Sequence, residues 1–281
     1  MQLNTDICDL ISNFINAPRY ELLDWIDIKK LNWRWLSSNP NAILLLKNNL
    51  DKIHWEELSK NSSAIEIIQE NLDKIHWCWL SSNPAAILLL KNNLDKINWS
   101  ELSLNINALD ILEENQDKID WYQLSTNSGA IPLLKKNMDK IIWYQLSYNS
   151  GAIEILEANQ DKIDWHILSE NTGAITLLSN NLDKIDWNRL SNNPNAISIL
   201  EKNQHKINWY YLSNKPLAIS LIEKNMDKID WHNLCENSAA IEILKKNQNN
   251  ICWTFASSNK SIFQYIDPIK LIRKTITIIL T

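Results

Sequence analysis

The side chains of this 281-residue chain that could do chemistry recur at one fixed interval. An Asp-Lys pair, which could transfer a proton, returns every 22 residues from Asp51 and Lys52 to Asp227 and Lys228, with His205 in place of one Asp. An active site needs unlike groups that meet at one place, whereas these pairs are alike and evenly spread. We therefore interpret them as parts of helix caps and surface ion pairs, which are individually weak.

The histidines do not form a catalytic or metal-binding pattern. His54 and His76 stand at equivalent positions of neighbouring repeats, so a full repeat separates them and they cannot share one zinc ion. We interpret both as substitutes for a helix N-cap. His166 and His232 have no Ser or Cys nucleophile beside them in the sequence. We predict a non-enzymatic protein with no catalytic residue, no metal site and no cofactor.

The cysteines and glycines add no further motif. The three glycines share one turn position of the repeat, so they do not form a phosphate-binding loop. The cysteines share no metal-like spacing, which favours free thiols in a reducing compartment. They are Cys8, Cys78, Cys235 and Cys252.

The two positions that follow each repeated tryptophan are better suited to binding. They vary from copy to copy beside a constant pattern, and they are rich in aromatic residues and Arg, which are common anchors of protein interfaces. The alternative, that these side chains only cover the neighbouring helix, stays open. The candidate partner-binding residues are Trp35, Trp79, Tyr122, Tyr144, His166, Arg189, Tyr210, Tyr211 and His232.

These residues sit in a 22-residue repeat that has no insertion or deletion. Eleven tryptophans mark its period: Trp33, Trp55, Trp77, Trp99, Trp121, Trp143, Trp165, Trp187, Trp209, Trp231 and Trp253. A repeat of this length, with apolar residues at helical spacing, is typical of a solenoid in which stacked copies share a continuous core. We predict an all-α fold, an α-solenoid of eleven two-helix repeats with N- and C-terminal capping segments.

The first helix of each copy is expected to begin at the tryptophan. In the copy around Trp121, Asp120 is placed as the N-cap, and Ile119 and Leu124 have the spacing of a hydrophobic staple. Gln123 stands where a capping box would use it. We expect both side chains that follow the tryptophan to face solvent.

The second helix is capped by an Asn that recurs in every copy except at Lys215. Asn127 illustrates this cap. Pro132 is anomalous, because it requires that the helix start late or bend. We expect the helix to end at another recurring Asn, such as Asn137, in the left-handed conformation that closes many helices. Helices of roughly 6 to 10 residues would be about 9 to 15 Å long.

The chain is predicted to be an array of repeats with a capping segment at each end. We predict an N-terminal helical cap over residues 1–32, tandem repeats over 33–266 and a C-terminal cap over 267–281. An amphipathic helix is expected near residues 7–15. Stacked helix pairs would form a rod or superhelix about 90 to 110 Å long.

Composition limits the partners. Net charge is −5 and the pI is about 5.6, so no basic field gathers phosphates, and nucleic acid is a disfavoured partner. No apolar run approaches the ~20 residues that span a bilayer. No secretory signal is visible, so we expect a cytoplasmic protein that does not enter a membrane. The sequence does not predict an oligomeric state.

The pattern NxDKIxWxxLSxNxxAIxLLxx resembles the Asn- and Trp-containing tandem repeats of proteins from giant DNA viruses of the Mimivirus kind. The resemblance covers residues 33 to about 255. It implies an all-α repeat protein made in the cytoplasm of an infected host, or in its virus factory, and it supplies no catalytic residue.

Three functions fit these observations. The favoured hypothesis is a repeat scaffold that binds a protein partner along the variable, aromatic-rich face. The alternative is a structural component of a virus particle or factory. A less favoured hypothesis is a reader of single-stranded RNA that stacks one base per repeat on its aromatic side chains.

Overall fold

Each copy of the repeat folds into two short helices separated by a turn. The structure is a computed structural model that describes residues 20–267. Within that range the predicted all-α solenoid is confirmed, with a second helix in ten copies and a strand in its place in the eleventh. The buried side chains of all copies form one continuous apolar core. The helices have 4 to 6 residues, shorter than predicted, because capping turns end each of them early.

The first helices of the copies are α2 (Trp33–Ser38), α4 (Trp55–Lys60), α6 (Trp77–Ser81), α8 (Trp99–Leu104), α10 (Trp121–Leu124), α12 (Trp143–Leu146), α14 (Trp165–Leu168), α16 (Trp187–Asn192), α18 (Trp209–Leu212), α20 (Trp231–Glu236) and α22 (Trp253–Ala256). The second helices are α3 (Ile43–Lys47), α5 (Ile65–Glu70), α7 (Ile87–Lys91), α9 (Leu109–Glu114), α11 (Ile131–Lys136), α13 (Ile153–Glu157), α15 (Ile175–Ser179), α17 (Ile197–Lys202), α19 (Ile219–Glu223) and α21 (Ile241–Lys246).

Short 3-10 turns complete the copies. Those that enter the second helix or strand are η2 (Pro40–Ala42), η4 (Ser62–Ala64), η7 (Ser128–Ala130), η12 (Pro216–Ala218) and η14 (Lys260–Ile262). Those that lead to the next tryptophan are η1 (Ile28–Lys30), η3 (Leu50–Lys52), η5 (Leu94–Lys96), η6 (Gln116–Lys118), η8 (Met138–Lys140), η9 (Gln160–Lys162), η10 (Leu182–Lys184), η11 (Gln204–Lys206) and η13 (Gln248–Asn250).

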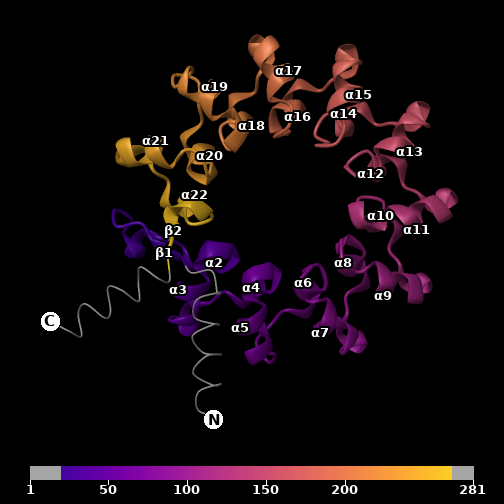
Figure 1. The fold of residues 1–281 in the computed structure, drawn as a ribbon, viewed down its shortest axis with the longest axis horizontal. Coiled ribbons are helices and arrows are strands. Elements are labelled where there is room, and N and C mark those ends of the chain that lie inside the picture. The colour runs from indigo at the N-terminus through magenta and orange to yellow at the C-terminus, as the bar shows by residue number, and fades with distance from the viewer. Residues whose placement is uncertain (1–19, 268–281) are drawn as a thin grey trace.

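The copies form a closed ring (Figure 1). The first helices lie on its inner side and the second helices on its outer side, and the indigo start of the array meets its yellow end. The predicted rod or superhelix is therefore wrong. Inner helices of neighbouring copies pack directly on one another, whereas outer helices are joined by exposed ion pairs such as Lys47–Glu66 and Lys135–Glu154. Each copy is thus a wedge, wider on the outside of the ring than on the inside.

A two-stranded sheet closes the outer side of the ring. Strand β1 (Tyr20–Leu22) pairs antiparallel with β2 (Phe263–Tyr265), with Glu21 opposite Gln264. The N–H of Leu23 also donates to the carbonyl of Ile262 at 2.9 Å. The sequence did not predict this sheet. The outer part of the eleventh copy is therefore built from both ends of the described chain.

The inner side closes through residues 28–32, which act as the connector of the eleventh copy. Lys30 lies over the ring of Trp253, 5.1 Å from its centroid. The N–H of Asn32 donates to Ser257 Oγ at 2.8 Å. Residues 20–32 thus bind the last copy. The amphipathic helix expected near residues 7–15, and all of the expected C-terminal cap except Asp267, lie outside the described residues.

A ladder of buried Asn side chains holds neighbouring copies together. Asn127 Nδ2 donates to the carbonyls of Ser103 and Asn105 in the preceding copy, at 2.9 and 3.0 Å. Its Oδ1 accepts from the N–H of Gly129, so Asn127 caps the 3-10 turn η7 that leads into the second helix, whereas α11 itself begins after Ala130, which makes no side-chain cap. Within residues 20–267 no buried side-chain nitrogen or oxygen lacks a partner. The cross-copy bonds follow from this requirement, since an unpaired buried polar group is costly.

A buried Ser forms a second ladder, which corrects the predicted capping box. Asp120 Oδ1 accepts from the N–H groups of Tyr122 and Gln123, so the N-cap itself is confirmed. The N–H of Asp120, however, donates to Ser103 Oγ of the preceding copy at 3.1 Å rather than to Gln123. The equivalent bond to a Ser, or once to a Cys, occurs at all eleven junctions, including the seam between the last copy and the first.

Two further expectations, the left-handed Asn at the end of the second helix and the ion pairs of the Asp-Lys connector, are wrong. The anomaly of Pro132 is resolved. Asn137 has φ −133°, not a left-handed value, and its Nδ2 donates to the carbonyl of Leu133 four residues earlier. Lys140 lies over the ring of Trp121 at 4.7 Å from its centroid instead of joining a ladder of ion pairs. Pro132 falls in the first turn of α11, so that helix starts late.

Candidate functional site

The inner helices carry the variable residues. In each copy the tryptophan is half-buried, while the residues three and four positions after it are buried, as Trp121, Leu124 and Ser125 show. The first, second and fifth residues after the tryptophan are the other positions of this segment. We call the side chains at these three positions of all copies the inner face. The first helix of each copy therefore lines the concave side, which the sequence alone left open (Figure 1).

Most of the predicted aromatic residues are exposed on the inner face. Tyr210 keeps 56% of its surface exposed, Tyr122 50% and Tyr144 47%, and Trp35 and Tyr211 each keep 40%. Side chains this exposed contribute little to the core. His166 and His232 are exposed as well.

Other side chains at the same positions cover their neighbours, as the alternative interpretation held. Glu57, Gln145 and Ile167 are buried, so the expectation that both residues after the tryptophan face solvent is wrong for these copies. Trp79 is half-buried, and its Nε1 donates to Glu56 Oε1 at 2.9 Å. Lys60 Nζ lies 3.8 Å from the centroid of the Trp79 ring. Trp79 therefore belongs to the packing between copies rather than to a free binding surface.

His166 and Arg189 meet in a polar network between α14 and α16. His166 Nδ1 lies 2.5 Å from Asp186 Oδ2, and its Nε2 accepts from Arg189 Nε at 2.7 Å. Arg189 Nη1 donates to Tyr148 Oη at 2.9 Å and to Glu170 Oε2 at 3.1 Å. Both imidazole nitrogens are thus occupied, so this His-Asp pair has no free nitrogen with which to activate a nucleophile.

The network borders a cavity of about 430 Å³ that opens at the surface. Its lining is polar, with two carboxylates, one guanidinium and one exposed ring from Tyr211. Burial lowers the pKa of Arg189, but the hydrogen bond and charge of Tyr148 and the charge of Glu170 outweigh it and raise that pKa. The guanidinium therefore stays charged and paired within the ring.

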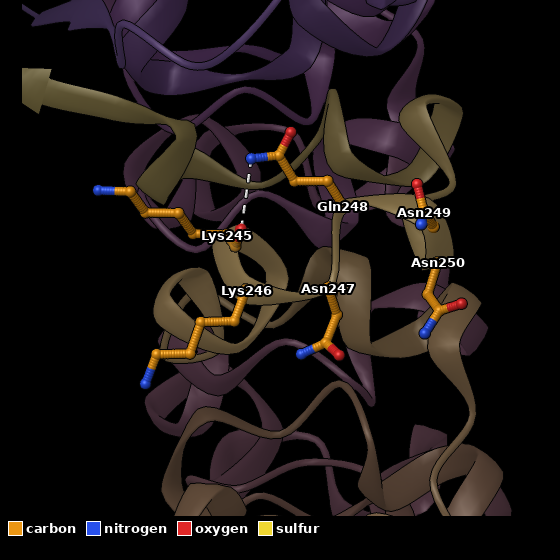
Figure 2. Close-up of a pocket in the computed structure, with 6 residues that line it drawn as sticks. All are labelled: Lys245, Lys246, Asn247, Gln248, Asn249 and Asn250. Carbon is orange, nitrogen blue, oxygen red and sulfur yellow. Dashed lines mark hydrogen bonds between the residues drawn. The ribbon is translucent and has the colours of Figure 1, made fainter.

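A second cavity, of about 420 Å³, lies at the end of α21 (Figure 2). It is formed by the six residues 245–250, and Gln248 Nε2 donates to the carbonyl of Lys245 at 3.3 Å. Asn249 and Asn250 replace the usual Asp and Lys of the connector there. All but one of the six lining residues are exposed, and their polar groups do not converge on one point in Figure 2. We assign no site to this cavity.

The seam adds an aromatic residue that sequence reasoning missed. Phe255 on α22 keeps 38% of its surface exposed, and its ring lies 5.9 Å from that of His232 in an edge-to-face arrangement. Trp35 stands at the equivalent position of the next inner helix, across the seam. Phe255 follows the repeated Trp253 at the same spacing as the candidates Trp35, Trp79, Arg189 and Tyr211, so that spacing was the available signal.

Carboxylates outnumber basic groups on the inner face and the N-caps of the inner helices. Nine carboxylates occur there: Glu56, Glu57, Glu101, Glu170, Glu236, Asp120, Asp164, Asp186 and Asp230. The three basic side chains are Arg34, Lys60 and Arg189. Each of the three is already paired with a carboxylate, Arg34 and Lys60 with Glu57, and Arg189 with Glu170. The inner face is therefore acidic.

Comparison with protein-family models, with curated proteins and with solved structures finds no match to this chain. In the part that the structure describes, no helix is long and apolar enough to cross a membrane. Residues 20–267 also hold no group of three or more metal-ligating side chains that could bind an ion.

Proposed function

We propose that this protein is a non-enzymatic ring scaffold that binds a protein partner through its inner face. The observation that carries this proposal is the exposure of aromatic side chains on the inner helices, in copies whose polar groups are otherwise paired. Tyr122, Tyr144 and Tyr210 contribute little to the stability of the ring, since each side chain is about half exposed. Aromatic side chains of this kind are frequent anchors of protein interfaces.

The ladders indicate that the residues that hold neighbouring copies together are different from the residues that would bind a partner. Asn127, Ser103 and their equivalents satisfy the backbone at each junction, and they recur almost without change. The inner-face residues change from copy to copy. A constant junction with a variable surface lets residues change for binding without loss of the fold.

Alanine substitutions on the inner face test this proposal. Tyr122→Ala, Tyr144→Ala and Tyr210→Ala, combined in one chain, should weaken capture of protein partners from expressing cells, as measured by mass spectrometry, while the melting temperature stays nearly unchanged. Leu88→Ala on outer helix α7 is the matched control, because Leu88 is also apolar and 70% exposed. Equal losses of capture in the triple variant and the control, or equal losses of capture and stability in the triple variant, would contradict the proposal.

Single-stranded RNA is less favoured as a partner. Stacking on aromatic rings would suit bases, but phosphates need basic groups nearby. The three basic side chains of the inner face are already neutralised by Glu57 and Glu170.

A further inference from the structure

Among the side chains of the inner face, Lys60 lies on the ring of Trp79. Lys60 Nζ is 3.8 Å from the centroid of the Trp79 ring and 3.4 Å from Glu57 Oε2. The face of an aromatic ring attracts a cation, and a carboxylate beside it adds charge attraction. An aromatic side chain with a carboxylate close to it can therefore bind a lysine, and in this chain Trp79 and Glu57 bind Lys60 in this way.

Exposed aromatic rings that carry no lysine occur on the inner helices around the seam. Tyr210 and Tyr211 on α18, Phe255 on α22 and Trp35 on α2 are all exposed. Within residues 20–267, none of the contacts between a cation and an aromatic ring falls on these four. We call them the seam arc, and Glu236 at the end of α20 lies within the same stretch of the ring.

The opening of the ring limits the shape of an occupant. Packed helices lie roughly 8 to 10 Å apart, so eleven inner helices on a circle give a radius of about 14 to 18 Å. Subtracting about 5 to 6 Å for half of a helix with its side chains leaves an opening roughly 16 to 26 Å wide. An extended segment can enter such an opening, while a folded domain of about 100 residues, with a radius of gyration near ~13 Å, is too wide.

We infer that the seam arc binds an extended polypeptide segment rich in lysine or arginine, with its cations on the exposed rings. The inference rests on the proposed function and names the chemistry of its partner. Charge complementarity supports it, because the inner face and the N-caps carry nine carboxylates and three basic groups, and all three basic groups are already paired. Lysine or arginine side chains of the partner would lie on the exposed rings of the seam arc, as Lys60 lies on the ring of Trp79.

Fluorescence anisotropy with a short labelled peptide that alternates lysine and serine tests this inference on the full chain. The peptide should bind, and its affinity should fall as salt is raised. The same peptide with acetylated lysines should bind at least about tenfold more weakly, because acetylation removes the charge and leaves the chain length. Tyr210→Ala combined with Tyr211→Ala should weaken binding of the lysine peptide by about tenfold.

Leu217→Ala is the matched control, because Leu217 lies in the same copy as the two tyrosines, is 66% exposed and is not on an inner helix. It should leave peptide affinity unchanged, and all variants should keep the melting temperature of the parent chain. Absence of peptide binding, equal affinity for the acetylated peptide, or an equal loss with Leu217→Ala would overturn the inference. Preferential binding of a polyuridylate probe would overturn it in favour of base stacking. If partner capture depends on the inner tyrosines but the lysine peptide does not bind, the proposed function stands and this inference fails.

Discussion

The seam between the last and first copies can be compared with an interior junction. In the interior, Asn127 Nδ2 donates to the carbonyls of Ser103 and Asn105 at 2.9 and 3.0 Å. At the seam, Asn39 Nδ2 donates to the equivalent carbonyls of Ser257 and Asn259 at 3.1 and 3.3 Å. The same interface therefore forms where the two copies are far apart in the sequence.

The two junctions differ in their outer layer and in chain continuity. The interior junction has an outer helix on each side, whereas the seam has β1 and β2 in the place of one helix. The peptide chain runs through the interior junction, and among the described residues only non-covalent contacts cross the seam. The difference teaches that the ladder needs no chain connection, and that at the seam the described residues are held together by non-covalent contacts alone.

The largest expected effect comes from removing a ladder side chain at each junction. Asn127→Ala should lower the free energy of unfolding by about 2 to 5 kcal/mol, because two carbonyls and one N–H lose their buried partner. Asn39→Ala should cost somewhat less and should also raise the radius of gyration as the seam opens. Urea unfolding and X-ray scattering measure the two quantities. The exposed Asn92→Ala should change stability by less than about 0.5 kcal/mol. A larger radius of gyration for Asn127→Ala than for Asn39→Ala would contradict the comparison.

Lys215 offers the opposite change, because it interrupts the ladder in the ninth copy. Burial lowers the pKa of Lys215, so its charge is unfavourable there. Lys215→Asn should restore the donations to the preceding copy and raise the free energy of unfolding by about 1 to 2 kcal/mol. Thermal unfolding of this variant beside Lys202→Asn, at an exposed position of α17, measures the gain. A loss of stability would show that the ladder does not set junction strength.

The junction between the first and second copies has a pH-dependent contribution. Burial raises the pKa of Glu57, but hydrogen bonds and charges from Arg34 and Lys60 outweigh it, so that pKa is lowered. The stabilisation is therefore present above the ordinary pKa of Glu and is lost as pH falls through the lowered value. Glu57→Gln should cost about 1 kcal/mol at pH 7 and less at a pH below the lowered pKa of Glu57 when urea unfolding is followed at both. An equal cost at both pH values would assign the effect to packing instead of charge.

The smallest expected effect compares the cation contacts of the two junctions. Lys30→Ala at the seam and Lys140→Ala in the interior each remove a lysine from a half-buried tryptophan ring. Each should cost about 0.5 to 1 kcal/mol in urea unfolding. The tenth copy already tolerates Asn250 at this position, which fits a small cost. A cost above about 2 kcal/mol for Lys30→Ala alone would mean that the seam depends on this contact more than an interior junction does.

Much of the repeat could be predicted from its local pattern. Asp120 caps its helix as expected, and Asn127 caps the turn that leads into the second helix, because capping depends on a few neighbouring residues. The same pattern placed Tyr122 and Tyr210 on an exposed face. The second use of Asn127, as a donor to the preceding copy, lay outside this reasoning because it depends on contacts between copies.

Ring closure could not be predicted because it depends on the angle between copies. A small change in that angle turns a closed circle into an open superhelix, and a repeat pattern does not fix it. The sequence holds only an indirect signal of closure. Residues Ile28 to Trp33, IKKLNW, repeat the connector pattern seen in Leu94 to Trp99, LDKINW, without a preceding copy. A connector at the start of the array needs the end of the array as its partner.

Distances between spin labels test ring closure most directly. Labels at Leu50 and Gln248 are two copies apart across the seam, and labels at Leu50 and Leu94 are two copies apart in the interior, all at exposed equivalent positions. A closed ring predicts nearly equal distances for the two pairs in pulsed electron resonance. A much longer distance between Leu50 and Gln248 would show an open solenoid and would contradict the ring.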